Sequence, residues 1–149
     1  MPNSAEKPRV FKFSEMAKET LWDGKLSRTA VRSDGAMVAV NWHQPGGARK
    51  APHSHPFDQL VLIINGTLGL DVGGHEVVMG PGTAMRIPAN VPHTGWTIGN
   101  EVVLNIDIFA PAREDYLFLA VNQDEYGAVP ANQSKGEIPS LNNKEKATA

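Results

Sequence analysis

The strongest evidence for the fold lies in residues 47–66, which read GARKAPHSHPFDQLVLIING. His53 and His55 are two positions apart, so in an extended chain both imidazoles point to the same side. Gln59 shares their parity and begins an apolar run, and His93 follows a stiff, proline-containing segment further along. Because neutral imidazole is the commonest protein ligand of first-row divalent metals, we predict that these four side chains surround one metal ion inside a β-barrel.

Composition narrows the class of protein. The chain has 149 residues and a formal net charge of −2, which suggests one domain and gives no sign of nucleic-acid binding. It contains no cysteine, so disulfides and thiolate metal ligands are excluded. The N-terminus lacks the apolar segment of a secretory signal, and no apolar run approaches the length of a membrane span. We therefore expect a cytoplasmic protein with a small-molecule substrate and with neither a nucleic-acid nor a membrane partner.

Short extended segments alternate with turn signals through the middle of the chain. Asn65-Gly66 and Gly73-Gly74 are hairpin dipeptides, and Gly80-Pro81-Gly82 marks a further turn. Short strands separated this often are typical of a sandwich or barrel, so we predict an all-β domain. The expected strands are residues 29–32, 36–42, 59–64, 67–72, 76–79, 84–87, 94–97 and 102–109.

The two ends of the chain differ from this middle. Residues 1–24 are predicted to be an N-terminal arm, in which residues 14–21 form either a short helical turn or an extended segment. Residues 25–122 are predicted to form the barrel. Residues 123–149 are polar, and because they can bury little apolar surface we predict a flexible C-terminal tail.

A second informative stretch, NIDIFAPAR, covers residues 105–113. In a strand, Asp107 and Phe109 share one face and Ile106 and Ile108 share the other. We interpret the isoleucine face as apolar core. The opposite face presents a carboxylate beside an aromatic ring, which could line a cavity.

Two charged residues of this region are candidates for direct roles. Asp107 could give or accept a proton, and Arg113 could lie over the barrel mouth and hold a substrate carboxylate through its planar guanidinium. By spacing alone, the simpler interpretation is that the two residues form a structural ion pair or are exposed. The roles of Trp42, His43 and Arg86 stay open. One of Trp42 and His43 could reach the barrel mouth, although core or rim packing is the simpler interpretation, and Arg86 could be a buried substrate-binding arginine or an outward charge.

The histidine stretch also carries a family resemblance. The first cupin motif consists of a glycine, a His-x-His pair, a glutamate and a second glycine. Gly47, His53, His55 and Gly66 fit these positions, and Gln59 stands where the motif has glutamate. The sequence therefore resembles the small single-domain cupins, the RmlC-like family, and the resemblance implies a jelly-roll, or double-stranded β-helix, barrel.

A second cupin motif lies downstream and consists of a glycine, a Pro-x-Gly pair, a histidine and an asparagine. Gly82, Pro88 and His93 fit it, whereas Asn90 replaces the motif glycine and Thr97 replaces the motif asparagine. Small cupins of this size commonly form dimers, so the resemblance implies a homodimer. The fold does not specify the chemistry, because cupins host many activities.

A narrower resemblance rests on two segments, HSHPFDQ at 53–59 and DIFAPAREDYL at 107–117. Together they are similar to the KdgF-type pectin-degradation cupins, which open unsaturated uronate monosaccharides to linear keto-uronates. The resemblance implies metal ligands at His53, His55, Gln59 and His93. It also implies substrate contacts or proton transfer at Asp107, Phe109 and Arg113.

The amide at Gln59 favours one class of chemistry. A carboxylate would cancel one charge of the metal, whereas an amide oxygen leaves the full double positive charge. We therefore predict an enzyme in which zinc, nickel, manganese or iron acts as a Lewis acid on a small, oxygen-rich substrate, by ring opening, isomerisation or lyase chemistry. The resemblance to the KdgF-type cupins implies that this substrate is uronate-like. The alternatives are a dioxygenase, a hydroxynitrile-type lyase and a non-enzymatic ligand-binding cupin.

Overall fold

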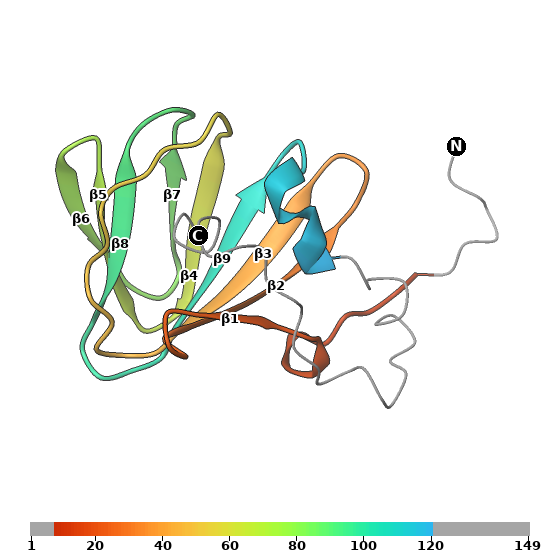
Figure 1. Ribbon diagram of the computed structural model, residues 1–149, viewed down its shortest axis with the longest axis horizontal. Helices are drawn as coiled ribbons and strands as arrows, with labels where there is room; N and C mark the ends of the chain where they lie inside the picture. Colours follow the sequence, from red (N-terminus) through yellow and green to blue (C-terminus); the bar gives the residue numbers. More distant parts are fainter. Residues whose placement is uncertain (1–7, 121–149) are drawn as a thin grey trace.

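Residues 8–120 are the part of the chain that the computed structural model describes, and they form nine strands and two short 3₁₀ helices (Figure 1). The six-stranded sheet contains, in spatial order, β1 (Glu19–Leu21), β2 (Leu26–Arg32), β3 (Met37–His43), β9 (Val103–Phe109), β4 (Gln59–Asn65) and β7 (Thr83–Ile87). The three-stranded sheet contains β6 (His75–Met79), β5 (Thr67–Val72) and β8 (His93–Ile98). The helices are η1 (Phe13–Glu15) and η2 (Glu114–Ala120).

The strand order confirms the predicted jelly-roll fold. Every pairing is antiparallel, and the central strand β9 joins β3 on one side to β4 on the other, although both lie far from it in the sequence. In the second sheet, β5 pairs with β8 across a similar gap. The two sheets therefore enclose one interior, and strands that are distant in the sequence contribute side chains to the same space.

The N-terminal segment contains a strand that the sequence analysis did not predict. Both alternatives for residues 14–21 hold in part, because η1 forms one helical turn and β1 then pairs with β2. The predicted arm therefore ends in a hairpin that is built into the larger sheet. The predicted tail, residues 123–149, lies outside the residues that the structure describes.

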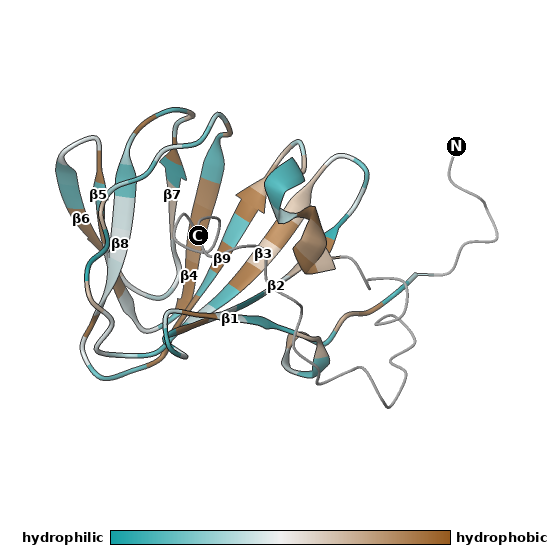
Figure 2. Ribbon diagram, in the orientation of Figure 1, coloured by the Kyte–Doolittle hydropathy of each residue, from teal (hydrophilic) through white to brown (hydrophobic). Residues whose placement is uncertain are grey.

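Two apolar clusters hold the barrel together. One packs η2 and the N-terminal segment against β2 and β3, and the other lies between β4, β5, β7 and β9. Figure 2 shows the apolar residues along β4, β9 and β3. Beside the first cluster, where it lies 4.7 Å from the ring centre of Tyr116, Arg28 pairs with Glu19 at 2.7 Å, and both side chains are almost fully buried. This ion pair ties β1 to β2.

The apolar face of β9 is not the core, and the interpretation of Ile106 and Ile108 was wrong. Both isoleucines are half-buried on the outside of the sheet, where Ile108 lies opposite the exposed Leu60 of β4. The buried face carries Asn105 and Phe109, with Asp107 between them. The polar side chains of this face point inward and line a cavity in the interior, which a packed apolar core would not contain.

Within residues 8–120, no helix has the length and apolar character needed to cross a membrane. The cytoplasmic location and the homodimer stay predictions.

Candidate metal centre

A backbone bridge brings the first and last histidines of the cluster together. The amide N–H of His53 donates to the carbonyl of His93 at 3.0 Å, and the amide of His93 donates back at 2.8 Å. Residues paired in this way project their side chains to the same side. The two imidazole centres are 4.5 Å apart as a result. These two hydrogen bonds therefore join the segment before β4 to the start of β8, and they bring the side chains of His53 and His93 together.

The turn before β8 is shaped by the residue that replaces the motif glycine. Asn90 has a φ of 65°, in the left-handed region where asparagine is tolerated better than most residues. The backbone N–H of Asn90 donates a hydrogen bond to the carbonyl oxygen of His55 at 2.8 Å. The carboxylate of Asp58 accepts a second hydrogen bond, from the backbone N–H of Ala89, at 2.8 Å. Asparagine can thus take the place of glycine here without loss of the turn that presents His93.

Two of the histidines are held in the tautomer that a metal requires. Nδ1 of His55 lies 2.9 Å from the carbonyl oxygen of Phe57, and Nδ1 of His93 lies 2.9 Å from that of Val91. A carbonyl oxygen can only accept, so each Nδ1 carries the proton and each Nε2 keeps a lone pair. The ligand atoms of the three histidines all lie within 4.8 Å of one another.

Gln59 directs its amide oxygen at the same point. Its side chain hydrogen-bonds to Asp107, and a carboxylate accepts from the amide nitrogen, so the oxygen faces the histidines. That oxygen lies 3.0 Å from Nε2 of His55. Two acceptor atoms therefore face each other at close range, and a cation between them would satisfy both.

Burial keeps the histidines neutral. Desolvation, followed by the nearby charges of His93, His55 and Arg113, lowers the pKa of His53 to about 4. Burial is also the first cause of the lowered pKa values of His55 and His93. A neutral imidazole is the form that binds a metal. The donor set, its tautomers and its protonation state therefore fit a divalent ion, with His53, His55 and His93 as the ligands that could hold it.

Asp107 lies in the cavity wall beside Gln59 and is surrounded by amide donors. Asn41 donates to its Oδ2 at 2.9 Å, and Asn105 donates to its Oδ1 at 2.9 Å. Burial raises the pKa of Asp107 to about 6, although the hydrogen bonds from the three amides and the charge of Arg113 oppose that rise. The carboxyl can therefore change protonation state close to neutral pH.

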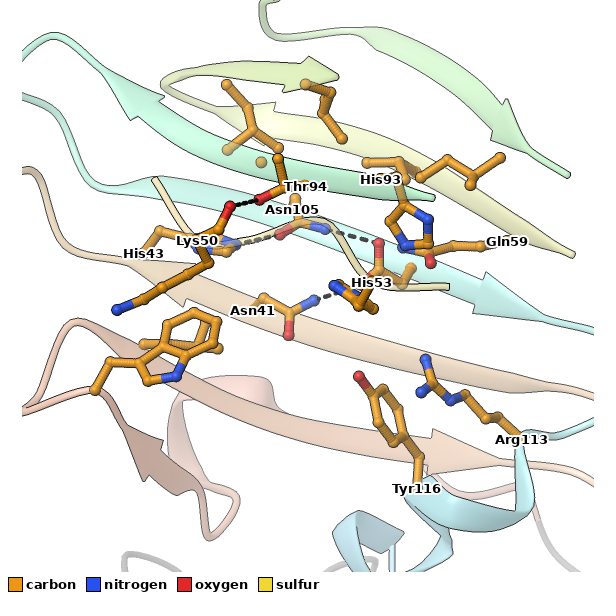
Figure 3. A pocket seen from close by; sticks show the side chains of 18 residues that line it. Asn41, His43, Lys50, His53, Gln59, His93, Thr94, Asn105, Arg113 and Tyr116 are labelled. Atoms are coloured by element: carbon orange, nitrogen blue, oxygen red, sulfur yellow. Dashed lines mark hydrogen bonds between the residues drawn. The ribbon is translucent and has the colours of Figure 1, made fainter. Parts of the chain in front are cut away.

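His43, which the sequence left unassigned, belongs to this network. Its Nε2 lies 2.6 Å from Oδ1 of Asn105 (Figure 3). Because Asn105 donates its N–H to Asp107, its oxygen must accept, so His43 is the donor. Burial lowers the pKa of His43, and the bond to Asn105 opposes that shift. The hydrogen bonds thus run in one direction, from His43 through Asn105 to Asp107.

Arg113 is buried at the other side of the cavity and is fixed by groups that the sequence did not identify. Its guanidinium lies 3.8 Å from the ring centre of Tyr116. Nε and Nη2 donate to the carboxylate of Asp115 at 2.7 and 2.8 Å. Among residues 8–120, Arg113 therefore pairs with Asp115 and not with Asp107, and Nη1 remains for a ligand.

The remaining candidates lie in different places. Phe109 is buried beside His55 and Tyr116, with ring centres 6.1 and 5.7 Å away. Arg86 is exposed and pairs with Asp58 at 3.2 Å, so it is an outward charge. Trp42 lies on the opposite strand face from His43 and contacts the ammonium of Lys18. Of the three residues left open, only His43 lines the cavity.

The fold and the histidine cluster define a jelly-roll barrel with three histidines that could hold one metal ion. A family model described as the cupin domain matches residues 42–109. Residues 42–109 thus resemble the cupin domain, and the fold is a jelly roll similar to that of small cupins such as KdgF.

Two solved structures illustrate this similarity. KdgF from Halomonas sp. superposes with a TM-score of 0.64 and 22% identity, over 73% of this chain and 98% of that one. An RmlC-like cupin from Shewanella frigidimarina superposes with a TM-score of 0.62 and 27% identity, over 73% of this chain and 96% of that one. No curated protein matches the chain.

Proposed function

We propose that this protein is a metal-dependent cupin enzyme that opens or isomerises a small uronate-like sugar acid. One observation carries the proposal: the carboxyl of Asp107 lines the same cavity as the three-histidine cluster and is held there by hydrogen bonds with Asn41, Asn105 and Gln59. Burial raises the pKa of this carboxyl to about 6. A general acid–base works best when its pKa is close to the operating pH. The likeness to KdgF supports a uronate as the substrate class.

A divalent ion held by His53, His55 and His93 would supply positive charge that polarises a substrate oxygen. Asp107 then performs the proton transfers. In the opening of an unsaturated uronate, its carboxylate accepts the proton of the anomeric hydroxyl while the bond between the anomeric carbon and the ring oxygen breaks. Asp107 returns that proton to the enol carbon, and the product is a keto acid. The reaction is an isomerisation and consumes no oxidant or water.

Arg113 and the amide network control how the substrate and the base are held. The unused Nη1 of Arg113 can donate to the substrate carboxylate, while Asp115 and Tyr116 keep the guanidinium in place. Asn41 and Asn105 each donate to one oxygen of Asp107, so the carboxylate keeps one orientation. Phe109 fills the space beside His55 and excludes water from that side.

The test is turnover of an unsaturated uronate monosaccharide by protein loaded separately with zinc, nickel, manganese or ferrous iron. Loss of the conjugated double bond is followed by absorbance in wild type, Asp107→Asn, His55→Ala and the control His75→Ala, which changes an exposed histidine. Turnover by wild type and the control alone supports the proposal. Full turnover by Asp107→Asn, or none by wild type with any metal, contradicts it. Oxygen uptake in the ferrous form would instead indicate a dioxygenase.

A further inference from the structure

A second, smaller chamber lies next to the cavity that contains the three histidines, and the two share part of their lining. The inner chamber measures about 110 Å³ and the outer about 60 Å³, and Trp22, His43, Lys50 and Gly95 line both. A single water needs roughly 10–15 Å³ of such space, so each chamber can admit part of a ligand. Any ligand that reaches the metal centre from this side passes Trp22 and Lys50.

Trp22 has an unfavourable backbone conformation at this position. Its φ is 53°, and that of the next residue, Asp23, is 55°. A bulky residue in the left-handed region is an outlier, and such outliers concentrate at functional sites. The pairing of β1 with β2, with Leu21 and Leu26 buried at the base of the turn, keeps the indole at the chamber wall. The turn would be more easily made by asparagine or glycine, so the indole itself has a use there.

The charge of the outer chamber is positive. Lys50 lies 5.0 Å from the ring centre of Trp22, and among residues 8–120 it has no acidic partner. Lys25 also lines this chamber, and no described residue with a carboxylate does. The neighbouring Arg49 differs, because Glu76 and Asp71 neutralise it at 2.7 and 2.8 Å. Of the two lysines at the outer chamber, Lys50 is thus the one that also lines the histidine cavity, and no carboxylate of the described residues neutralises it.

A second cation lies at the opposite side of the same cavity. Figure 3 shows Lys50 and His43 at one side and Arg113 and Tyr116 at the other, with His93 and Gln59 apart from both. A ligand that spans the cavity therefore meets a guanidinium at one end and an ammonium beside an indole at the other. The C–H face of a sugar ring can rest on the indole, while an oxyanion pairs with the ammonium.

We propose that Trp22 and Lys50 form an outer subsite that selects uronates carrying a second anionic group, a carboxylate or a sulfate ester, at the end away from Arg113. This inference rests on the proposed function for the inner chamber. It assigns Lys50 to the second anion and Trp22 to the sugar ring.

The test measures the affinity of zinc-loaded protein by calorimetry for galacturonate, for galactarate, which has a carboxylate at each end, and for a sulfated glucuronate. We expect the doubly charged ligands to bind about tenfold more tightly than galacturonate, and Lys50→Gln to remove that difference. Arg49→Gln is the matched control and should preserve it, because Arg49 is already neutralised. Preference for galactarate alone, or for the sulfated ligand alone, identifies which oxyanion the subsite takes.

Trp22→Asn separates a binding role from a structural one. Asparagine tolerates the backbone conformation, so the midpoint of thermal unfolding should be unchanged or higher while galacturonate and the sulfated glucuronate, which contain a sugar ring, bind more weakly and the open-chain galactarate is affected less. A lower midpoint with unchanged affinity would show that the indole is structural and overturn its part of the proposal. Equal affinity of wild type for singly and doubly charged ligands, with turnover of the unsaturated uronate intact, overturns the outer subsite alone. Binding of none of them likewise overturns the outer subsite, and it overturns both proposals when turnover of the unsaturated uronate is also absent.

Discussion

The two ends of the cavity are built in different ways. At the inner end, His53 and His93 are joined by paired backbone hydrogen bonds, and His55 is oriented by a carbonyl oxygen. At the outer end, Trp22 occupies a strained turn and Lys50 is exposed, with one ring contact between them. Several hydrogen bonds of the fold hold the inner end in place, so we expect the inner end to determine which reaction is catalysed. The outer end can change without loss of the fold, so we expect it to set the specificity.

The largest effect is expected at the inner end. His93→Ala keeps the backbone bridge to His53 but removes one imidazole from the cluster. Loss of groups that merely orient a ligand costs about 10–100-fold in metal affinity, so loss of the ligand itself should cost at least about 100-fold. Calorimetric titration with zinc measures the change, with His75→Ala as the control. An unchanged affinity would show that His93 is not a ligand.

The next effect separates proton transfer from metal binding. Asp107→Asn removes the ionisable group but keeps hydrogen-bonding capacity toward Gln59. Turnover should fall by about 100-fold or more, the usual contribution of general acid–base catalysis. Zinc affinity should change much less, because Asp107 lies outside the histidine cluster. Equal losses in both quantities would mean that Asp107 holds the metal site together and has no separate role.

The buried ion pair that joins β1 to β2, beside Tyr116 and away from the outer chamber, should contribute strongly to the stability of the fold. Glu19→Gln leaves Arg28 buried without a counter-ion, and removal of one partner of such a pair costs about 3–5 kcal/mol. Urea unfolding measures the loss. Lys12→Ala breaks the exposed pair with Glu15 and should cost less than about 1 kcal/mol. Similar losses of unfolding free energy in the two variants would contradict the claim that burial makes the Glu19–Arg28 pair more important than an exposed pair.

The smallest effect is a pH dependence at the junction of the two chambers. Burial lowers the pKa of His43 below its unfolded value of about 6.5. Between these two values the unfolded chain binds more protons, so folding stability is full above pH 6.5 and decreases as the pH falls through that range. His43→Gln should remove part of this decrease, as measured by unfolding in urea at several pH values. An identical pH dependence in the variant would show that His43 is not held neutral.

Much of the fold could be predicted from the sequence because alternating apolar residues and glycine turns act locally. The strands β4 to β9 lie close to the predicted ranges, including the hairpin at Gly73-Gly74. β1 was not predicted, since ETL is too short to show a pattern and its turn contains Trp22 where glycine would be expected. The strain of that turn depends on pairing with β2, which a local pattern does not reveal.

The candidate site was only partly predictable for a similar reason. His53, His55 and His93 could be grouped because their spacing and turns are local features, and the structure brings them together. Asn41, Asn105 and His43 read as ordinary polar strand residues, and their common target appears only when β3 pairs with β9. The face of Ile106 was assigned wrongly because the interior contains a polar cavity. Apolar character alone therefore does not identify the inner face of a barrel strand.

The central claim is that three histidines and Gln59 hold one divalent ion. The most direct test is a crystal structure of protein incubated with zinc, with anomalous scattering recorded at the zinc edge. The account predicts one anomalous peak between the three imidazoles, about 2.0–2.1 Å from a nitrogen of each, with the oxygen of Gln59 directed at it. No peak at this position, or a peak bound by other residues, would contradict it.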